Sequence, residues 1–205
     1  MTAFLGYDVL EIQPNRISAK AKVSRLANTL DNRSGRRTVD DRQNVPTRQM
    51  SFSWFNRSRA EVAVLTAFVA ARKGRAVPFW VPTWQDDLVL AANAAIGATA
   101  LYVEDCDYIA HQYSHLPRKF LGLVSYDGTI QPRYVSGAGV TTPGQEDLTI
   151  HSALTAALTV GQCLISFLML SRLKNDEVKI TWHSASVATC TMDFVELPSE
   201  YEAPS

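Results

Sequence analysis

Hydrophobic and polar residues alternate most clearly between residues 48 and 55. Large apolar side chains occupy every second position there (Met50, Phe52 and Trp54), and polar residues fill the positions between them. Because successive side chains of a strand point to opposite faces, this pattern predicts a half-buried strand. Residues 17–23 alternate in the same way and predict a second strand.

Residues 59–73 carry a helical pattern instead. Ser58 precedes the segment and Glu61 follows three positions later, which is the spacing of a capping box at a helix start. Gly74 stands where a helix commonly ends, because glycine readily adopts a left-handed conformation. The pattern predicts one helix from about Arg59 to Lys73, whose buried stripe recurs at helical spacing: Val64, Leu65, Phe68 and Ala71.

The remaining apolar segments are short and favour strands. Asp127 and Gly128 lie between two of them and predict a tight hairpin, and residues 136–144 read as a Gly-, Thr- and Pro-rich loop. The last three segments, 163–173, 178–182 and 187–195, predict a meander. The expected fold is therefore mainly β, of the α+β class, with one capped helix packed on a sheet. Further strands are expected over residues 9–12, 76–82, 87–90, 98–103, 120–124, 130–135 and 147–151.

Composition excludes some classes of protein and leaves others open. Lys plus Arg and Asp plus Glu both total 20 in the 205 residues, so the formal net charge is zero. This balance gives no support to a free nucleic-acid-binding domain, which is usually basic, and it suits a subunit that associates with others. The start of the chain lacks the pattern of a secretory signal, and the apolar runs are too short to span a membrane, so no membrane insertion is expected.

The chain is long enough for one domain or two small ones. We expect residues 1–104 to form a β domain that contains the helix. Residues 105–205 are expected to form a second β-rich part, which in the alternative interpretation belongs to the same domain.

The stretch from Asp40 to Val103 resembles a known family. A basic loop is followed by residues 50–55 (Met-Ser-Phe-Ser-Trp-Phe), the predicted helix, and then residues 74–84 (Gly-Arg-Ala-Val-Pro-Phe-Trp-Val-Pro-Thr-Trp), with an Asp-Asp-Leu sequence shortly after. This order is similar to that of distal tail proteins of long-tailed bacteriophages. Three further segments resemble the same group, so that the likeness covers about half of the chain: Arg172-Leu173, Asp176-Glu177-Val178 with Thr181-Trp182, and Asp193 to Pro198.

The resemblance implies a structural role and no catalytic site. Members of this family are β-rich, split-barrel or β-sandwich-like subunits of the tail tip or baseplate. They form a ring, commonly of six copies, that joins the tail tube to the tip or hub. The implied partners are other copies of this chain, the tube protein, the hub protein and the tape measure protein, with DNA passing through the ring without sequence recognition. The implied location is the virion, after synthesis in the host cytoplasm, and no cofactor is expected.

An enzymatic alternative depends on three side chains. His111 and His115 are four residues apart, which on a helix places them on one face, and Cys106 is nearby. These residues leave open a zinc site, a tail-associated peptidase or a metal-dependent hydrolase. Acidic neighbours of Cys106 argue against a reactive thiolate, and the position after His111 is Gln112, where a zinc peptidase needs a glutamate. No phosphate-binding, nucleophile-elbow or dinucleotide fingerprint is present in the sequence.

A binding alternative depends on aromatic residues. Phe79, Trp80 and Trp84 could form a platform for a host-surface glycan. Aromatic residues at this density after a helix are more often part of a core or a subunit contact, and we favour that interpretation.

Opposite charges gather at two places in the sequence. Because a ring needs two complementary patches, we predict that a basic and an acidic region meet across neighbouring subunits. Two unrelated solvated loops are the alternative, and no spacing selects an acid–base pair among the acidic residues. The candidate interface residues are Arg33, Arg36, Arg37 and Arg42 on the basic side, and Asp193, Glu196 and Glu200 on the acidic side.

Overall fold

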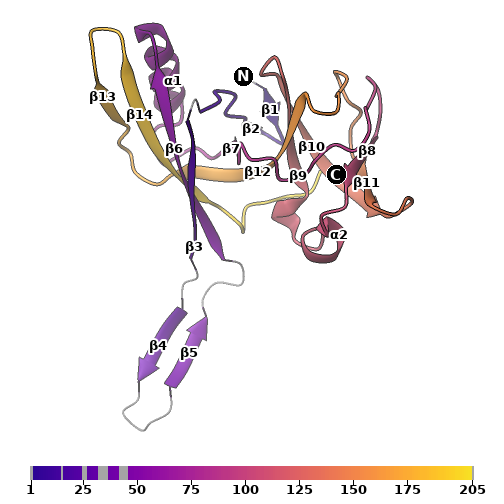
Figure 1. Ribbon diagram of the computed structural model, residues 1–205. Coiled ribbons are helices and arrows are strands. Elements are labelled where there is room, and N and C mark those ends of the chain that lie inside the picture. The colour runs from indigo at the N-terminus through magenta and orange to yellow at the C-terminus, as the bar shows by residue number, and fades with distance from the viewer. Residues whose placement is uncertain (1, 15, 25–26, 32–36, 42–45, 205) are drawn as a thin grey trace. The chain divides into compact units, whose positions relative to one another are not determined.

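A computed structural model describes residues 2–14, 16–24, 27–31, 37–41 and 46–204 (Figure 1). The chain forms two compact units, each assembled from segments that are distant in sequence. Unit 1 comprises residues 1–14, 78–170 and 201–205, and unit 2 comprises residues 15–77 and 171–200. Glu104 and Asp105, on either side of the expected boundary, both belong to unit 1.

Unit 1 contains a sheet in which β9, β10 and β11 are consecutive both in the chain and in the order of the strands. The first five residues of β12 (Cys163–Leu173) pair antiparallel with β9. β9 pairs in turn with β10, β10 with β11, and β11 with β8, all antiparallel. The other elements of this unit are short. Its strands and helices are β1 (Ala3–Phe4), β2 (Tyr7–Asp8), β7 (Phe79–Pro82), β8 (Ala100–Glu104), α2 (Tyr108–His111), a 3-10 turn (Leu116–Arg118), β9 (Phe120–Ser125), β10 (Ile130–Gly139) and β11 (Gln145–Ile150).

Unit 2 is a sheet with one helix on it. β14 lies in the middle and pairs antiparallel with β6, which in turn pairs with β3. A separate hairpin of β4 and β5 is drawn in Figure 1. The elements are β3 (Arg16–Ser24), β4 (Ala27–Asp31), β5 (Arg37–Asp41), β6 (Thr47–Asn56), α1 (Arg59–Ala71), β13 (Lys179–Trp182) and β14 (Ala188–Glu196), with the last three residues of β12.

The predicted fold class is confirmed: the structure is mainly β, and the capped helix packs on a sheet. In β6 the side chains of Met50, Phe52 and Trp54 are buried, as the alternation predicts. The Ser58 hydroxyl accepts a hydrogen bond from the Glu61 N–H at 3.2 Å. The carboxylate of Glu61 accepts the N–H of Arg57 at 2.8 Å, one residue before the position that a regular capping box uses.

The buried face of α1 differs from the predicted stripe. Val64 is 54% exposed, and Val62 is buried beside Leu65 and Phe68. Val62, Leu65 and Phe68 are three positions apart, so they form one continuous stripe along the helix. Val64 is also apolar, and the sequence pattern alone does not show whether position 62 or position 64 is buried. The helix also ends two residues early, at Ala71.

The predicted meander of the last three strands is wrong. β13 does not pair with β12; both strands pair with β14, β13 through residues 188–191 and β12 through residues 194–196. They lie end to end along one edge of β14, and both run antiparallel to it. Residues 174–178 form a loop between them that does not reverse the chain direction. The sequence predicts the three strands correctly but not their neighbours.

The hairpin predicted at Asp127–Gly128 is confirmed. β9 and β10 pair antiparallel on either side of it, with Ile130 opposite Val124, and Gly128 has a φ of 84°. The loop expected from residue 136 begins later, because β10 continues to Gly139 and pairs with β11 past an irregularity between Val135 and Gly137. Within the described part of the chain, no helix is long and apolar enough to cross a membrane.

Candidate functional site: a basic pocket in unit 2

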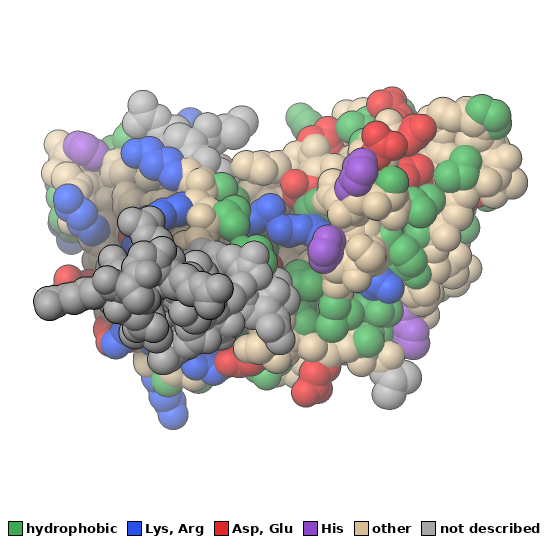
Figure 2. Space-filling model, turned by 90° about the horizontal axis from the view of Figure 1, so that it is seen from below, with side chains coloured by type: hydrophobic (Ala, Val, Ile, Leu, Met, Phe, Trp, Pro, Cys, Tyr) green, Lys and Arg blue, Asp and Glu red, His purple; other side chains and the backbone are tan. Residues whose placement is uncertain are grey.

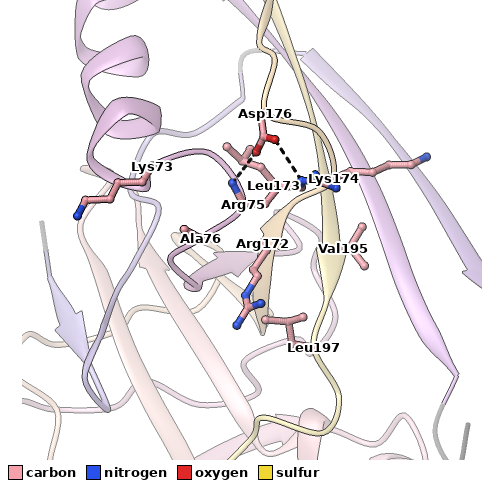
Figure 3. A pocket seen from close by; sticks show the side chains of 9 residues that line it. All are labelled: Lys73, Arg75, Ala76, Arg172, Leu173, Lys174, Asp176, Val195 and Leu197. Carbon is pink, nitrogen blue, oxygen red and sulfur yellow. Dashed lines mark hydrogen bonds and ion pairs between the residues drawn. The ribbon is translucent and has the colours of Figure 1, made fainter.

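A pocket of about 600 Å³ opens in unit 2 beside the end of α1. Figure 3 shows the side chains that line it, which come from the segment after α1, from β12 and the loop that follows it, and from the end of β14. Four of them are basic and one is acidic. The lining residues are Lys73, Arg75, Ala76, Arg172, Leu173, Lys174, Asp176, Val195 and Leu197.

Asp176 holds the segment after α1 in place. Its Oδ1 accepts the backbone N–H of Arg75 at 2.9 Å, and its Oδ2 lies 3.4 Å from Nε of Arg75. Gly74 makes this contact sterically feasible, because a Cβ at position 74 would lie 2.4 Å from Asp176 Oδ1. Lys73 and Gly74 both have positive φ values, of 49° and 67°, so the chain turns sharply where the helix ends.

Arg172 has a fixed position on the opposite wall. Its Nη2 lies 3.2 Å and 3.3 Å from the two carboxylate oxygens of Glu200. This pair and the Arg75–Asp176 pair each neutralise one cation. Lys73 and Lys174 are exposed and have no carboxylate within ion-pair distance among the described residues. The pocket therefore carries a net positive charge and suits a negatively charged surface or group.

Four separate segments of the sequence, 74–84, 172–173, 176–178 and 193–198, meet at this pocket. They contain seven of its nine lining residues; Lys73 directly precedes the first segment, and Lys174 lies between the second and the third. Sequence reasoning noted each segment separately but could not show that they converge, because Arg75 and Leu197 are far apart in the chain and only the fold of unit 2 joins them.

The predicted interface residues are not gathered in one place that the structure describes. Arg33, Arg36 and Arg42 lie outside the described residues, and Arg37 is the first residue of β5. Glu196 is only 4% exposed, so its carboxylate is not on the surface of unit 2. Glu200 is engaged by Arg172.

Asp193 is the acidic candidate with the most basic surroundings. It lies on the face of the sheet that α1 does not cover, in a smaller pocket of about 160 Å³. Lys20, Lys22 and Lys174 line the same pocket. The face around Asp193 is therefore basic as a whole, and the predicted acidic patch is not formed by these three residues.

The enzymatic candidates lie in unit 1 around the short helix α2. His111 is the last residue of α2 and His115 lies beyond it, so the two histidines do not share a helical face. Both are exposed. On the face drawn in Figure 2, one histidine lies beside acidic side chains and another beside basic ones. Among the described residues, no group of three or more His, Cys, Asp or Glu side chains is arranged to hold a metal ion.

The surroundings of Cys106 raise the pKa of its thiol. Burial raises its pKa first, and the carboxylate of Glu146, whose Oε2 is 3.8 Å from the Cys106 Sγ, raises it further. A nucleophilic cysteine needs the opposite influence, a nearby cation or helix N-terminus that favours the thiolate. This environment does not support a Cys–His peptidase.

Glu146 is a structural carboxylate that the sequence reasoning missed. It is 2% exposed, and its oxygens accept the N–H groups of Tyr108 at 3.1 Å and Ile109 at 2.8 Å, at the start of α2. A signal for it exists in the sequence, because Glu146 alternates with Leu148 and Ile150 and so falls on the buried face of its strand.

The aromatic residues expected to form a core do so. Trp80 is 1% exposed and packs among Phe4, Phe120 and Tyr201 in unit 1, and its indole N–H donates to the carbonyl of Phe4 at 2.8 Å. Trp84 is buried as well. Neither ring is on the surface of unit 1, so the two do not form a platform for a glycan.

No protein-family model matches the chain, and no curated protein matches it either.

Proposed function

We propose that this chain is a structural subunit of a bacteriophage tail tip, which forms a ring between the tail tube and the tip or hub. The observation that supports the proposal is the basic pocket. Residues from separate segments that resemble distal tail proteins line it together, and it has no constellation of groups for catalysis. Its net positive charge suits contact with an acidic surface of a neighbouring subunit.

The pocket needs an acidic complement on the neighbouring copy. Unit 1 offers one in three exposed residues: Glu104, the last residue of β8, and Asp105 and Asp107, which precede α2. A contact between a basic pocket and an acidic loop is heterologous, because the two surfaces differ, and repeated contacts of this kind close into a ring when the rotation allows. In this proposal the acidic loop replaces the buried Glu196 and the engaged Glu200 as the acidic side of the interface.

The other proposed partners are those of the family that the chain resembles: the tube protein, the hub protein and the tape measure protein. The channel of the ring would let DNA pass without reading its sequence. The role of the protein is then mechanical: its ring joins the tail tube to the tip or hub.

Native mass spectrometry and negative-stain images of the purified chain test the proposal. We expect an annular multimer whose mass falls in the double variant Lys73→Glu with Lys174→Glu, because both lysines line the pocket and neither belongs to an ion pair of the described residues. Lys179→Glu, an exposed lysine outside the pocket, is the matched control and should leave the mass unchanged. A monomer in solution, together with absence of the chain from purified phage particles, would contradict the proposal.

A further inference from the structure

A second surface of unit 2 is a groove of about 470 Å³ between α1 and β13. One wall is the face of α1 formed by Arg59, Val62, Ala63 and Thr66, and the other is the ring of Trp182. The four helix residues stand at positions i, i+3, i+4 and i+7, so they form one continuous strip along the helix. The Trp182 side chain is 49% exposed, so part of its ring is open to a ligand in the groove.

The strand beside this groove has an open edge. Among the described residues β13 pairs only with β14. The N–H of His183 donates to the carbonyl of Val187 at 2.8 Å, so these two residues form a hydrogen-bonded pair. Hydrogen-bonded and non-hydrogen-bonded pairs alternate along an antiparallel ladder. The backbone groups of Ile180 and Trp182 therefore point away from β14, toward the open edge.

The groove is closed at one end. The Nε of Arg59 donates to the carbonyl of Ala185 in the β13–β14 turn at 2.8 Å, which joins the first residue of α1 to that turn. The guanidinium also lies 5.8 Å from the centre of the Trp182 ring. The closed end thus carries the positive charge of Arg59, which favours a carboxylate.

We propose that this groove binds the C-terminal segment of a partner polypeptide by strand addition to β13. The backbone of the segment pairs with Ile180 and Trp182, and its terminal carboxylate lies at Arg59. The side chains that face α1 are small or β-branched and apolar, because Val62, Ala63 and Thr66 offer a shallow wall. This binding site is independent of the proposed ring contact, which uses other residues.

The closed end explains why the partner segment is a chain terminus. An internal segment would have to leave the groove past the Arg59–Ala185 hydrogen bond, whereas a terminus ends there. Strand addition supplies affinity through main-chain hydrogen bonds, and pockets beside the strand then select among side chains. An acidic side chain within an internal segment is accordingly not the expected ligand.

An array of immobilised peptides tests the proposal with the full-length chain. The peptides are about six residues long, the usual length of a strand. They have free C-termini and carry Val, Ile, Thr or Ala in varied order at the last four positions. We expect a subset to bind, and conversion of their C-terminus to an amide to weaken binding about tenfold or more, because a charge-assisted hydrogen bond is lost.

Three further measurements separate strand addition from adhesion to an exposed tryptophan. Hydrogen exchange at the amides of Ile180 and Trp182 should slow when a binding peptide is added. N-methylation of alternate peptide amides should abolish binding in one register and spare it in the other. Arg59→Gln should weaken binding as much as amidation does, whereas Arg59→Lys should restore part of it and Arg57→Gln, which alters an exposed arginine outside the groove, should have no effect.

The proposal fails if no peptide binds, or if free and amidated peptides bind equally well. It also fails if binding leaves the exchange of the Ile180 and Trp182 amides unchanged. Loss of binding in Arg59→Gln is interpreted only after circular dichroism and thermal unfolding show that the variant folds like the parent chain.

Discussion

Asp176 accepts the backbone N–H of Arg75 at 2.9 Å although 101 positions separate the two residues. The contact closes a loop between the end of α1 and the segment between β12 and β13. Both side chains are about 60% exposed, so the ion pair itself contributes little to stability. The backbone hydrogen bond contributes to the local geometry of the pocket, because it fixes the segment that carries Arg75 and Ala76.

Replacement of Gly74 by alanine should destabilise the chain measurably. Its φ of 67° is strained for any residue with a Cβ, and the added methyl group would collide with Asp176. The strain should cost about 1–2 kcal/mol and the collision about 1 kcal/mol more, as denaturant unfolding can measure.

Two variants separate these contributions. Gly128→Ala has a similar positive φ but open space around the new Cβ, so it should show the strain alone. In the Asp176→Ala background, Gly74→Ala should cost less than in the parent chain. Equal losses in both backgrounds would show that the close approach to Asp176 is not what requires glycine at this position.

Cys106 should react slowly with a thiol-alkylating reagent despite its exposure. Burial and Glu146 raise the pKa of its thiol, and only the thiolate reacts. The alkylation rate, followed peptide by peptide with mass spectrometry, should therefore continue to rise with pH beyond the point at which an unperturbed cysteine has reached its plateau.

Glu146→Gln should speed this reaction at a fixed pH near 8. The substitution removes a negative charge beside the sulfur, so the pKa of Cys106 falls and the thiolate fraction grows. The effect should be partial, because burial remains and is the larger cause. Asp127→Asn, which changes a distant surface carboxylate of the same unit, is the control; an equal change in rate there would contradict the assignment.

Asp87→Ala should destabilise unit 1, and Asp86→Ala should not. A carboxylate oxygen of Asp87 accepts both the hydroxyl of Thr83 and the backbone N–H of Phe167, the latter at 2.8 Å. Its removal leaves a partly buried N–H in β12 without that partner, at a cost of about 1–3 kcal/mol. Thermal unfolding of the two variants side by side checks this, and similar midpoints would contradict it.

Ser58→Ala should cost about 1 kcal/mol through loss of the helix cap, whereas Ser58→Gly should cost only a few tenths. The comparison is best made by denaturant unfolding followed by far-ultraviolet circular dichroism. If Ser58→Ala leaves the free energy of unfolding unchanged, the hydrogen bond from the Glu61 N–H to the Ser58 hydroxyl does not stabilise the start of α1.

Local patterns in the sequence were sufficient to predict most elements. The alternation at residues 48–55, the cap at Ser58 and the Asp127–Gly128 turn depend on neighbours along the chain, and each is found in the structure. Where a pattern admitted two solutions, as on the helix face with Val62 and Val64, packing against the sheet decided which residue is buried.

The candidate site was harder to predict from the sequence, because its parts are remote in the chain. Arg75, Arg172 and Asp176 belong to three separate segments of the sequence, and no rule of spacing places them in one pocket. Glu146 was overlooked for a different reason: a carboxylate in a strand suggests an exposed face, whereas here the N–H groups at the start of α2 satisfy it in the interior.

By itself, the sequence determined most of the longer strands and the main helix, since alternation, capping and turn preferences act over a few residues. Only the tertiary structure decided which strands are neighbours, that β12 and β13 share one edge of β14, and that the pocket exists. The physical reason is that strand pairing and side-chain burial are set by contacts between distant segments. The free energies of these contacts depend on the whole of each unit, so the residue type at a single position does not reveal them.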